Sequence, residues 1–219
     1  MPEINSIPYE NAEDLRYFLF DNYITTEMII LDHSGTGIVY ATNNQLRLST
    51  GVLELSIAKI YYDNPIFNPL YGSAIFKMRM DSEVDCFAFF GFKAGTAEPT
   101  FDMIESHSGF MVQDGKVYAS VGDGDEQQRV EIVGLDPLRV QEYKVEYNRF
   151  FIKPLPVTEE QLSLPTVLSV VREWTEVLWL SNYPPENQAH YIIQHIKNTV
   201  NTDKNIYFYR FIYRQVYSD

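Results

Sequence analysis

Residues 74–80 alternate between apolar and polar side chains, with Lys77 and Arg79 standing between apolar neighbours. This period of two predicts a β-strand with one buried and one exposed face. Residues 86–92 are apolar at every position, from Cys86 to Phe92. A strand of that kind is expected in the centre of a sheet, covered on both sides.

Two further alternating runs, residues 109–112 and 116–121, flank the pair Asp114 and Gly115. Asp-Gly between such runs predicts a hairpin, because a tight primed turn requires positive φ at both central positions. Residues 129–133 and 142–147 continue the alternation, and glycines mark the turns between them. The pattern therefore predicts a mainly β protein, a two-sheet antiparallel sandwich forming a single domain over residues 1–219.

The N-terminal part is less regular. Residues 2–24 mix acidic and aromatic side chains and predict an irregular arm, followed by a strand at 27–31 and a turn at 32–37. Residues 46–51 and 52–62 are predicted to be strands. Two prolines within residues 63–69 predict a loop.

The character of the chain changes near the C-terminus, where a partly helical extension is expected at about 154–205. Residues 158–161 have the form of a capping box. Residues 167–180 carry apolar side chains at helical spacing, although 176–180 would also suit a strand. Residues 187–200 place Ala189, Ile192, Ile193 and Ile196 on one face, which predicts a surface helix. A final strand is predicted at 206–216.

Composition adds two constraints. The hydrophobic fraction of 45% supplies a sizeable core, and the 16 Tyr and 14 Phe are residue types that favour pleated surfaces. The net charge of −13 repels polyphosphates and anionic membranes, so no nucleic acid or membrane partner is expected.

The single cysteine, Cys86, lies inside the apolar strand and is expected to be a buried, unreactive thiol. No secretory signal and no apolar stretch of ~18 residues is visible. A cytoplasmic location is expected, and a virion-associated protein would show the same features.

The order of these segments resembles that of the concanavalin A-like lectin/glucanase superfamily. The matching segments, within roughly residues 45–152, are Leu46–Gly51, Tyr71–Gly72 at the start of a strand, 86–92, 109–119, Gly134–Asp136 and Glu142–Tyr147. The resemblance implies a jelly-roll sandwich of two curved sheets. One departure is that Lys153–Pro156 follow residues 150–152, where many relatives have a short Asp-Gly turn.

The resemblance also directs attention to residues 100–105. Laminarinase-type glucanases carry Glu-x-Asp-x-x-Glu in a strand after the equivalent of 86–92, as nucleophile, helper and acid/base. Asp102 and Glu105 match the last two positions and are the candidate catalytic residues, but Thr100 occupies the nucleophile position. A threonine without an adjacent base cannot replace a carboxylate. Retention requires two carboxyl groups about 5–5.5 Å apart. A β-bulge at residues 103–104 is therefore expected, turning Glu105 into an open groove beside Asp102.

The candidate ligand-binding residues are Tyr118, His107, Trp174 and Trp179. Tyr118 should project from the outer side of its sheet. The two tryptophans could stack on sugar rings, although both lie among Val and Leu, which favours the core. The four histidines show no recognised zinc spacing and are expected to be solvated.

No cofactor is expected. The weak candidates for a metal site are Asp123 and Asp125, in the glycine-rich turn 122–126. The distant glutamate and the glycine of a full calcium loop are missing, so a solvated turn is the expectation.

Three functions remain open. The first is a non-catalytic lectin-like module that binds a glycan or a protein surface. The second is a glycoside hydrolase, β-glucanase-like, that uses Asp102 and Glu105. The third is a structural or assembly protein, for example of viral type, whose tyrosine-rich C-terminal strand and helices dock a partner.

Overall fold

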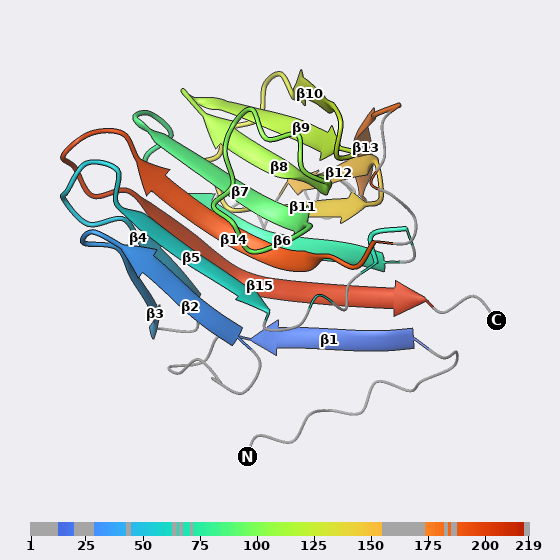
Figure 1. The fold of residues 1–219 in the computed structure, drawn as a ribbon, viewed down its shortest axis with the longest axis horizontal. Helices are drawn as coiled ribbons and strands as arrows, with labels where there is room; N and C mark the ends of the chain where they lie inside the picture. The colour runs from blue at the N-terminus through green and yellow to red at the C-terminus, as the bar shows by residue number, and fades with distance from the viewer. Residues whose placement is uncertain are drawn as a thin grey trace, which may run out of the picture.

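The computed structural model describes residues 13–19, 29–42, 45–62, 65, 68–70, 72–154, 174–181, 184 and 188–216. These residues form two antiparallel sheets, sheet A and sheet B, that pack face to face. Figure 1 looks onto sheet B, with sheet A behind it. The sandwich expected from the period-two pattern is confirmed.

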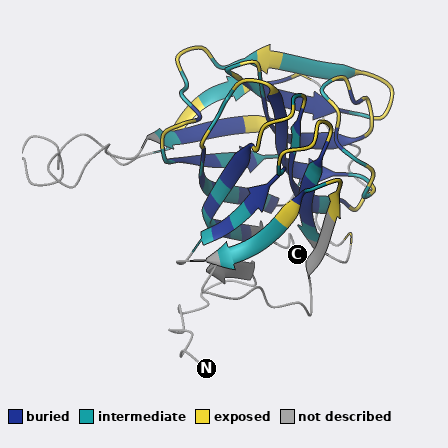
Figure 2. Ribbon diagram, turned by 90° about the vertical axis from the view of Figure 1, so that its left-hand side faces the viewer, coloured by how far each residue is buried: buried dark blue, intermediate teal, exposed yellow. Residues whose placement is uncertain are grey.

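Sheet A contains, in spatial order, β13 (Thr175–Trp179), β12 (Arg149–Pro154), β11 (Gln141–Glu146), β6 (Gly72–Met80), β15 (Asn205–Val216), β4 (Gln45–Ser49) and β3 (Ile38–Thr42), with β1 (Glu13–Leu19) also paired to β15. Sheet B contains β10 (Gln127–Glu131), β9 (Lys116–Gly122), β8 (His107–Gln113), β7 (Cys86–Lys93), β14 (Tyr191–Asn198), β5 (Ile57–Tyr62) and β2 (Ile29–Ser34). Figure 2 shows that the buried residues lie mainly in the strands and the exposed ones mainly in the connecting loops.

The main core lies between the sheets and is largely aromatic. Strand β6 alternates strictly between buried and partly exposed residues, as its sequence predicts. Its Phe76 contacts Phe90 of β7 edge-to-face, with 5.3 Å between ring centroids. Phe90 in turn stacks on Phe110 at 5.5 Å, and Phe110 meets Phe150 at 5.2 Å. Such pairs stabilise a core beyond their buried area.

A second, smaller cluster covers the other face of sheet B. It contains the outward side chains of β7, Phe87 and Phe89, together with Met103, Met111 and Ile193. Every residue of β7 is therefore buried. The prediction of a central strand covered on both faces is confirmed, and the buried position of Cys86 with it.

The predicted hairpin is also confirmed. Strands β8 and β9 are joined by Asp114 and Gly115, which have φ values of 50° and 77°. Both central residues thus adopt the left-handed conformation of a primed turn.

The predicted helix at 187–200 is wrong in the described part, because residues 191–198 form β14 between β7 and β5. Residues 175–179 form β13, so the strand alternative holds for this segment. The physical reason is that β14 lies in the middle of sheet B and is covered on both faces, which removes the simple alternation of a half-exposed strand. Residues 158–173, where further helix was expected, lie outside the described residues.

Smaller corrections concern the N-terminal half. Residues 13–19 of the expected irregular arm form β1, paired with β15. Strand β5 begins at Ile57, and residues 52–55 form turns instead of its first half. Among the described residues there is no helix long and apolar enough to span a membrane.

Candidate functional site

The outer face of sheet B, turned away from the main core, carries an unusual set of charges. Its five central strands are β5, β14, β7, β8 and β9. The outward positions on these strands include six basic residues: Lys59, Lys93, His107, Lys116, His195 and Lys197. In these described strands no outward position holds Asp or Glu.

The connection from β7 to β8, residues 94–106, crosses this face and is here called the strap (Figure 1). Its two ends are joined by a hydrogen bond from the Ala94 N–H to the Ser106 carbonyl. In its middle, Phe101 packs on Phe87 and Tyr118, with centroid distances of 6.3 and 5.2 Å. The strap therefore contributes its own apolar side chains to the second cluster.

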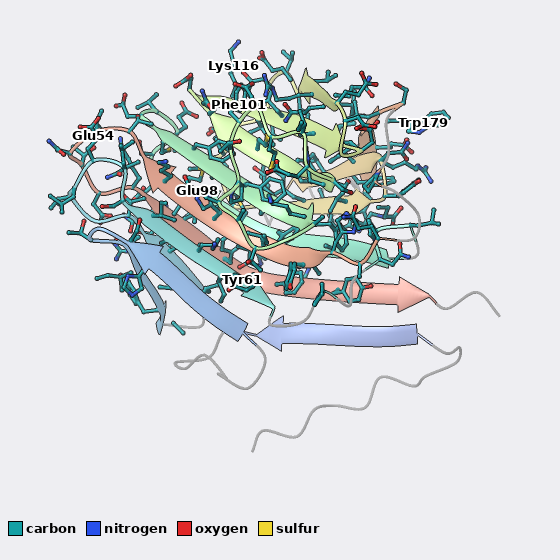
Figure 3. The ribbon with its side chains drawn as sticks, viewed as in Figure 1. Glu54, Tyr61, Glu98, Phe101, Lys116 and Trp179 are labelled. Atoms are coloured by element: carbon teal, nitrogen blue, oxygen red, sulfur yellow. The ribbon has the colours of Figure 1, made fainter. Side chains whose placement is uncertain are left out.

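Basic side chains of the sheet hold the strap in place. Lys59 Nζ donates to the Thr96 carbonyl at 2.7 Å, and Lys197 Nζ lies 2.7 Å from Oε1 of Glu98. Arg129 of β10 donates to the Phe101 carbonyl. Figure 3 shows Glu98 and Phe101 above the strands of sheet B. The strap thus supplies the anionic and carbonyl oxygen atoms that the strands of this face lack.

The predicted strand and β-bulge at residues 100–105 are wrong, because these residues lie in the strap and not in a strand. Phe101 and Met103 face the sheet, which leaves Asp102 and Glu105 exposed to solvent. Asp102 Oδ1 lies 3.1 Å from Arg129, with its side chain 85% exposed. An open groove was expected on this face, but the strap covers it.

The expectation of solvated histidines is wrong for three of the four. His33 is exposed, whereas His107, His190 and His195 are completely buried. His107 Nδ1 lies 2.7 Å from the Glu105 carbonyl oxygen, and Nε2 lies 2.8 Å from Ser120 Oγ. Burial lowers the pKa of His107 to about 4, so the ring is neutral.

His195 differs from the other two buried histidines because neither of its ring nitrogens has a hydrogen-bond partner. It stands directly opposite Lys59 across β14 and β5, and its ring lies 5.7 Å from that of Phe87. Burial, with smaller contributions from Lys59 and Lys197, lowers the pKa of His195 to about 3. A buried polar side chain without partners is rare in folded proteins.

Part of the face stays accessible beside the strap. Tyr61 of β5 and Tyr191 of β14 are both partly exposed and meet edge-to-face, with centroids 5.9 Å apart. Lys59 Nζ lies 5.3 Å from the Tyr61 ring. Figure 3 shows Tyr61 near the end of β5. Sequence reasoning missed this pair because Tyr191 lay in a predicted helix.

The other candidate ligand-binding residues do not gather at one place. Tyr118 projects from the outer face of β9, as predicted, but Phe101 of the strap packs against it. Trp174 and Trp179 lie at the β13 edge of sheet A. Trp174 lies near Lys144 and Lys153. The core assignment of Trp179 is wrong, because this side chain is 73% exposed on an edge strand.

The turn at 122–126 is stabilised by its own carboxylate. Asp123 Oδ1 accepts the backbone N–H groups of Asp125 and Glu126, both at 2.9 Å, and these bonds lower the pKa of Asp123. Among the residues that the structure describes, no three His, Cys, Asp or Glu side chains are grouped to hold a metal ion.

Comparison with known proteins gives matches in structure. No protein-family model matches the sequence, and no curated protein does either. The fold is similar to an endo-acting O-glycanase from the human gut microbiota (11% identity, TM-score 0.62, covering 93% of this chain and 99% of that one). It is also similar to SCLam, a non-specific endo-β-1,3(4)-glucanase of family GH16 (11%, 0.61, 97% and 94%).

The carbohydrate recognition domain of Emp46p is a third similar structure, at 8% identity and a TM-score of 0.58, covering 89% of this chain and 95% of that one. Glycan-cleaving enzymes and a carbohydrate recognition domain thus share this architecture. At such identities the likeness is one of fold, and the chain has a two-sheet jelly-roll fold similar to that of these glycan-cleaving enzymes and of this carbohydrate recognition domain.

Proposed function

We propose that this chain binds carbohydrate without cleaving it, through the accessible part of the outer face of sheet B. The observation that carries the proposal is that no outward position on the five central strands holds a carboxylate. Hydrolysis of a glycosidic bond ordinarily requires a fixed pair of carboxyl groups flanking that bond. Asp102 and Glu105 are on the strap, exposed, and Asp102 pairs with Arg129.

The aromatic pair supplies the binding surface. Tyr61 and Tyr191 are partly exposed and stand on two adjacent strands, which fixes their relative position. The face of an aromatic ring suits the apolar face of a pyranose, and the phenolic hydroxyl adds a hydrogen-bonding group. The glycan-related functions of the similar structures agree with a ligand of this kind.

Isothermal titration calorimetry after a glycan-array survey tests this proposal. Tyr61→Ala and Tyr191→Ala should each weaken binding of the best array ligand by about tenfold or more. Tyr40→Ala is the matched control, because Tyr40 is a partly exposed tyrosine of sheet A. Loss of binding in Trp179→Ala with Tyr61→Ala unaffected would move the site to the edge of sheet A.

Catalysis is tested separately with a reducing-sugar assay on a broad panel of polysaccharides. No release is expected. Release that disappears in Glu105→Gln would overturn the non-catalytic assignment and favour a hydrolase.

A further inference from the structure

The outward positions of the five central strands of sheet B carry only basic charges, whereas the chain as a whole is acidic. The protein has a net charge of −13, with 30 acidic residues against 17 Lys and Arg. Yet Lys59, Lys93, Lys116 and Lys197 all lie at outward positions of the five central strands, where no acidic residue occurs. A local field of sign opposite to the net charge selects for ligands that carry the matching charge.

An acidic side chain of the chain itself occupies part of this face. Glu98 of the strap pairs with Lys197, and their side chains are 35% and 27% exposed. An ion pair in contact with solvent contributes little to stability. Another anion can therefore replace Glu98 at Lys197 at little cost.

His195 provides an independent indication that this region is incompletely satisfied. It is wholly buried between the flanking positions of Lys59 and Lys197, with both ring nitrogens unpartnered. Leaving such a group buried without a hydrogen bond destabilises the folded protein. The folded protein retains this destabilising histidine. Residues that lower stability are common where a surface serves ligand binding.

From this arrangement we infer that the ligand of the proposed carbohydrate site is an acidic oligosaccharide, carrying carboxylate or sulfate groups. One sugar ring binds at the Tyr61–Tyr191 pair, where it stacks on one of the two perpendicular rings and touches the other, and an acidic group of a further ring binds Lys197 in place of Glu98. The inference rests on the proposed function, since it names the class of glycan bound there.

The spacing of the two anchors requires more than one sugar. Tyr61 stands opposite Ile193 of β14, and Lys197 lies four residues further along the same strand. Four residues of a β-strand span about 13 Å. That distance exceeds the width of a single pyranose ring, so an oligosaccharide is needed to reach both anchors.

Calorimetry with chain-length-matched probes tests the inference. Oligogalacturonate and a sulfated heparin oligosaccharide should bind, while neutral laminari-oligosaccharide should bind more weakly. Lys197→Gln should weaken binding of the acidic probes by about tenfold, the loss expected for one charge-assisted contact, and leave the neutral probe unchanged. Glu98→Gln should strengthen binding of the acidic probes, because the competing carboxylate is gone.

The matched control is Lys116→Gln. Lys116 lies on the same face but at β9, where its exposed side chain pairs with the half-buried Glu131. Its replacement should leave all affinities unchanged. Increasing salt should reduce the affinity of the acidic probes for the unaltered protein and much less so in Lys197→Gln.

The possible failures are distinguishable. Neutral glycans bound in a Tyr61-dependent manner, with no preference for acidic probes, would overturn the inference and leave the proposed function standing. No binding of any glycan would overturn both. Single-stranded DNA bound tightly, with the same dependence on Lys197, would overturn the assignment of the ligand to glycans.

Discussion

Ser106 Oγ lies 2.8 Å from Nε2 of His190, in the layer where the strap meets the sheet. Nδ1 of the same ring lies 2.7 Å from the Gln188 carbonyl oxygen, which can only accept a hydrogen bond. Nδ1 therefore carries the proton, and Nε2 accepts from the serine hydroxyl. Burial lowers the pKa of His190 to about 4, in keeping with this neutral form.

Acid should therefore destabilise the fold before the carboxylates titrate. Unfolded imidazoles take up protons near pH 6.5, whereas His107 and His190 remain neutral in the folded chain until about pH 4. Between these values the unfolded state binds more protons, so the free energy of unfolding falls as the pH is lowered. Each of the two should contribute about 2 kcal/mol of loss between pH 7.5 and 5.

Urea unfolding at pH 7.5, 6 and 5 measures this dependence. The variant His190→Gln cannot titrate and should show a shallower slope. A free energy of unfolding that stays constant over this range would show that the buried histidines do not behave as described.

Replacing the unpartnered histidine should stabilise the protein. His195→Leu keeps a similar volume and removes a buried polar group without hydrogen bonds. The free energy of unfolding is expected to rise by about 1–2 kcal/mol. His107→Leu is the matched comparison and should be destabilising, because it leaves the Glu105 carbonyl without its side-chain partner and removes one of the two partners of Ser120 Oγ, the other being Gln127. Equal effects of both changes would contradict the distinction drawn between the two rings.

The loop between β4 and β5 contains a residue in an unfavourable conformation. Leu55 has a φ of 61° and is 57% exposed, so its side chain gains little from burial. The left-handed conformation costs about 1–2 kcal/mol for a non-glycine residue, and Leu55→Gly should recover about 1 kcal/mol. Thermal unfolding of Leu53→Gly provides the control, since Leu53 is equally exposed but is not in this conformation. That control should lose stability, and a gain in both variants would argue for a general effect of the loop.

The buried thiol should be unreactive in the native protein. Burial is the main cause that raises the pKa of Cys86 to about 12, so almost no thiolate exists at pH 8. A thiol reagent is expected to modify the protein only in denaturant, with one equivalent consumed. Rapid labelling under native conditions would mean that β7 opens readily at its Cys86 end.

The strands that were predicted well are those whose two faces differ or whose turns have distinctive chemistry. Polar and apolar side chains alternate along β6 because one of its faces is partly exposed to solvent. The β8–β9 turn carries Asp114 and Gly115, which tolerate positive φ. In β14 the polar residues Gln194 and His195 are buried together with the apolar Ile192, Ile193 and Ile196. Their spacing imitates an amphipathic helix, because polarity does not indicate exposure when burial is imposed by neighbouring strands.

The candidate site was predictable only in part. That Tyr118 and His107 occupy the outer side of sheet B follows from alternation alone. The course of the strap depends instead on long-range contacts, such as that of Phe101 with Phe87 and of Glu98 with Lys197. The local motif at residues 100–105 does not reveal those long-range contacts. They hold this segment as part of a loop, and the strand expected from the motif is therefore absent there.

The placement of β14 and β15 has a consequence for folding during synthesis on the ribosome. β14 fills the gap between β7 and β5, and β15 fills the gap between β6 and β4, so the last strands in the chain occupy the middle of both sheets. A nascent chain that has emerged only through residue 190 can close neither sheet, and it exposes unpaired edges of β5, β6 and β7. Neither sheet can be completed until residues 191–216 are available, so closure of the sandwich depends on pairings between segments far apart in the sequence.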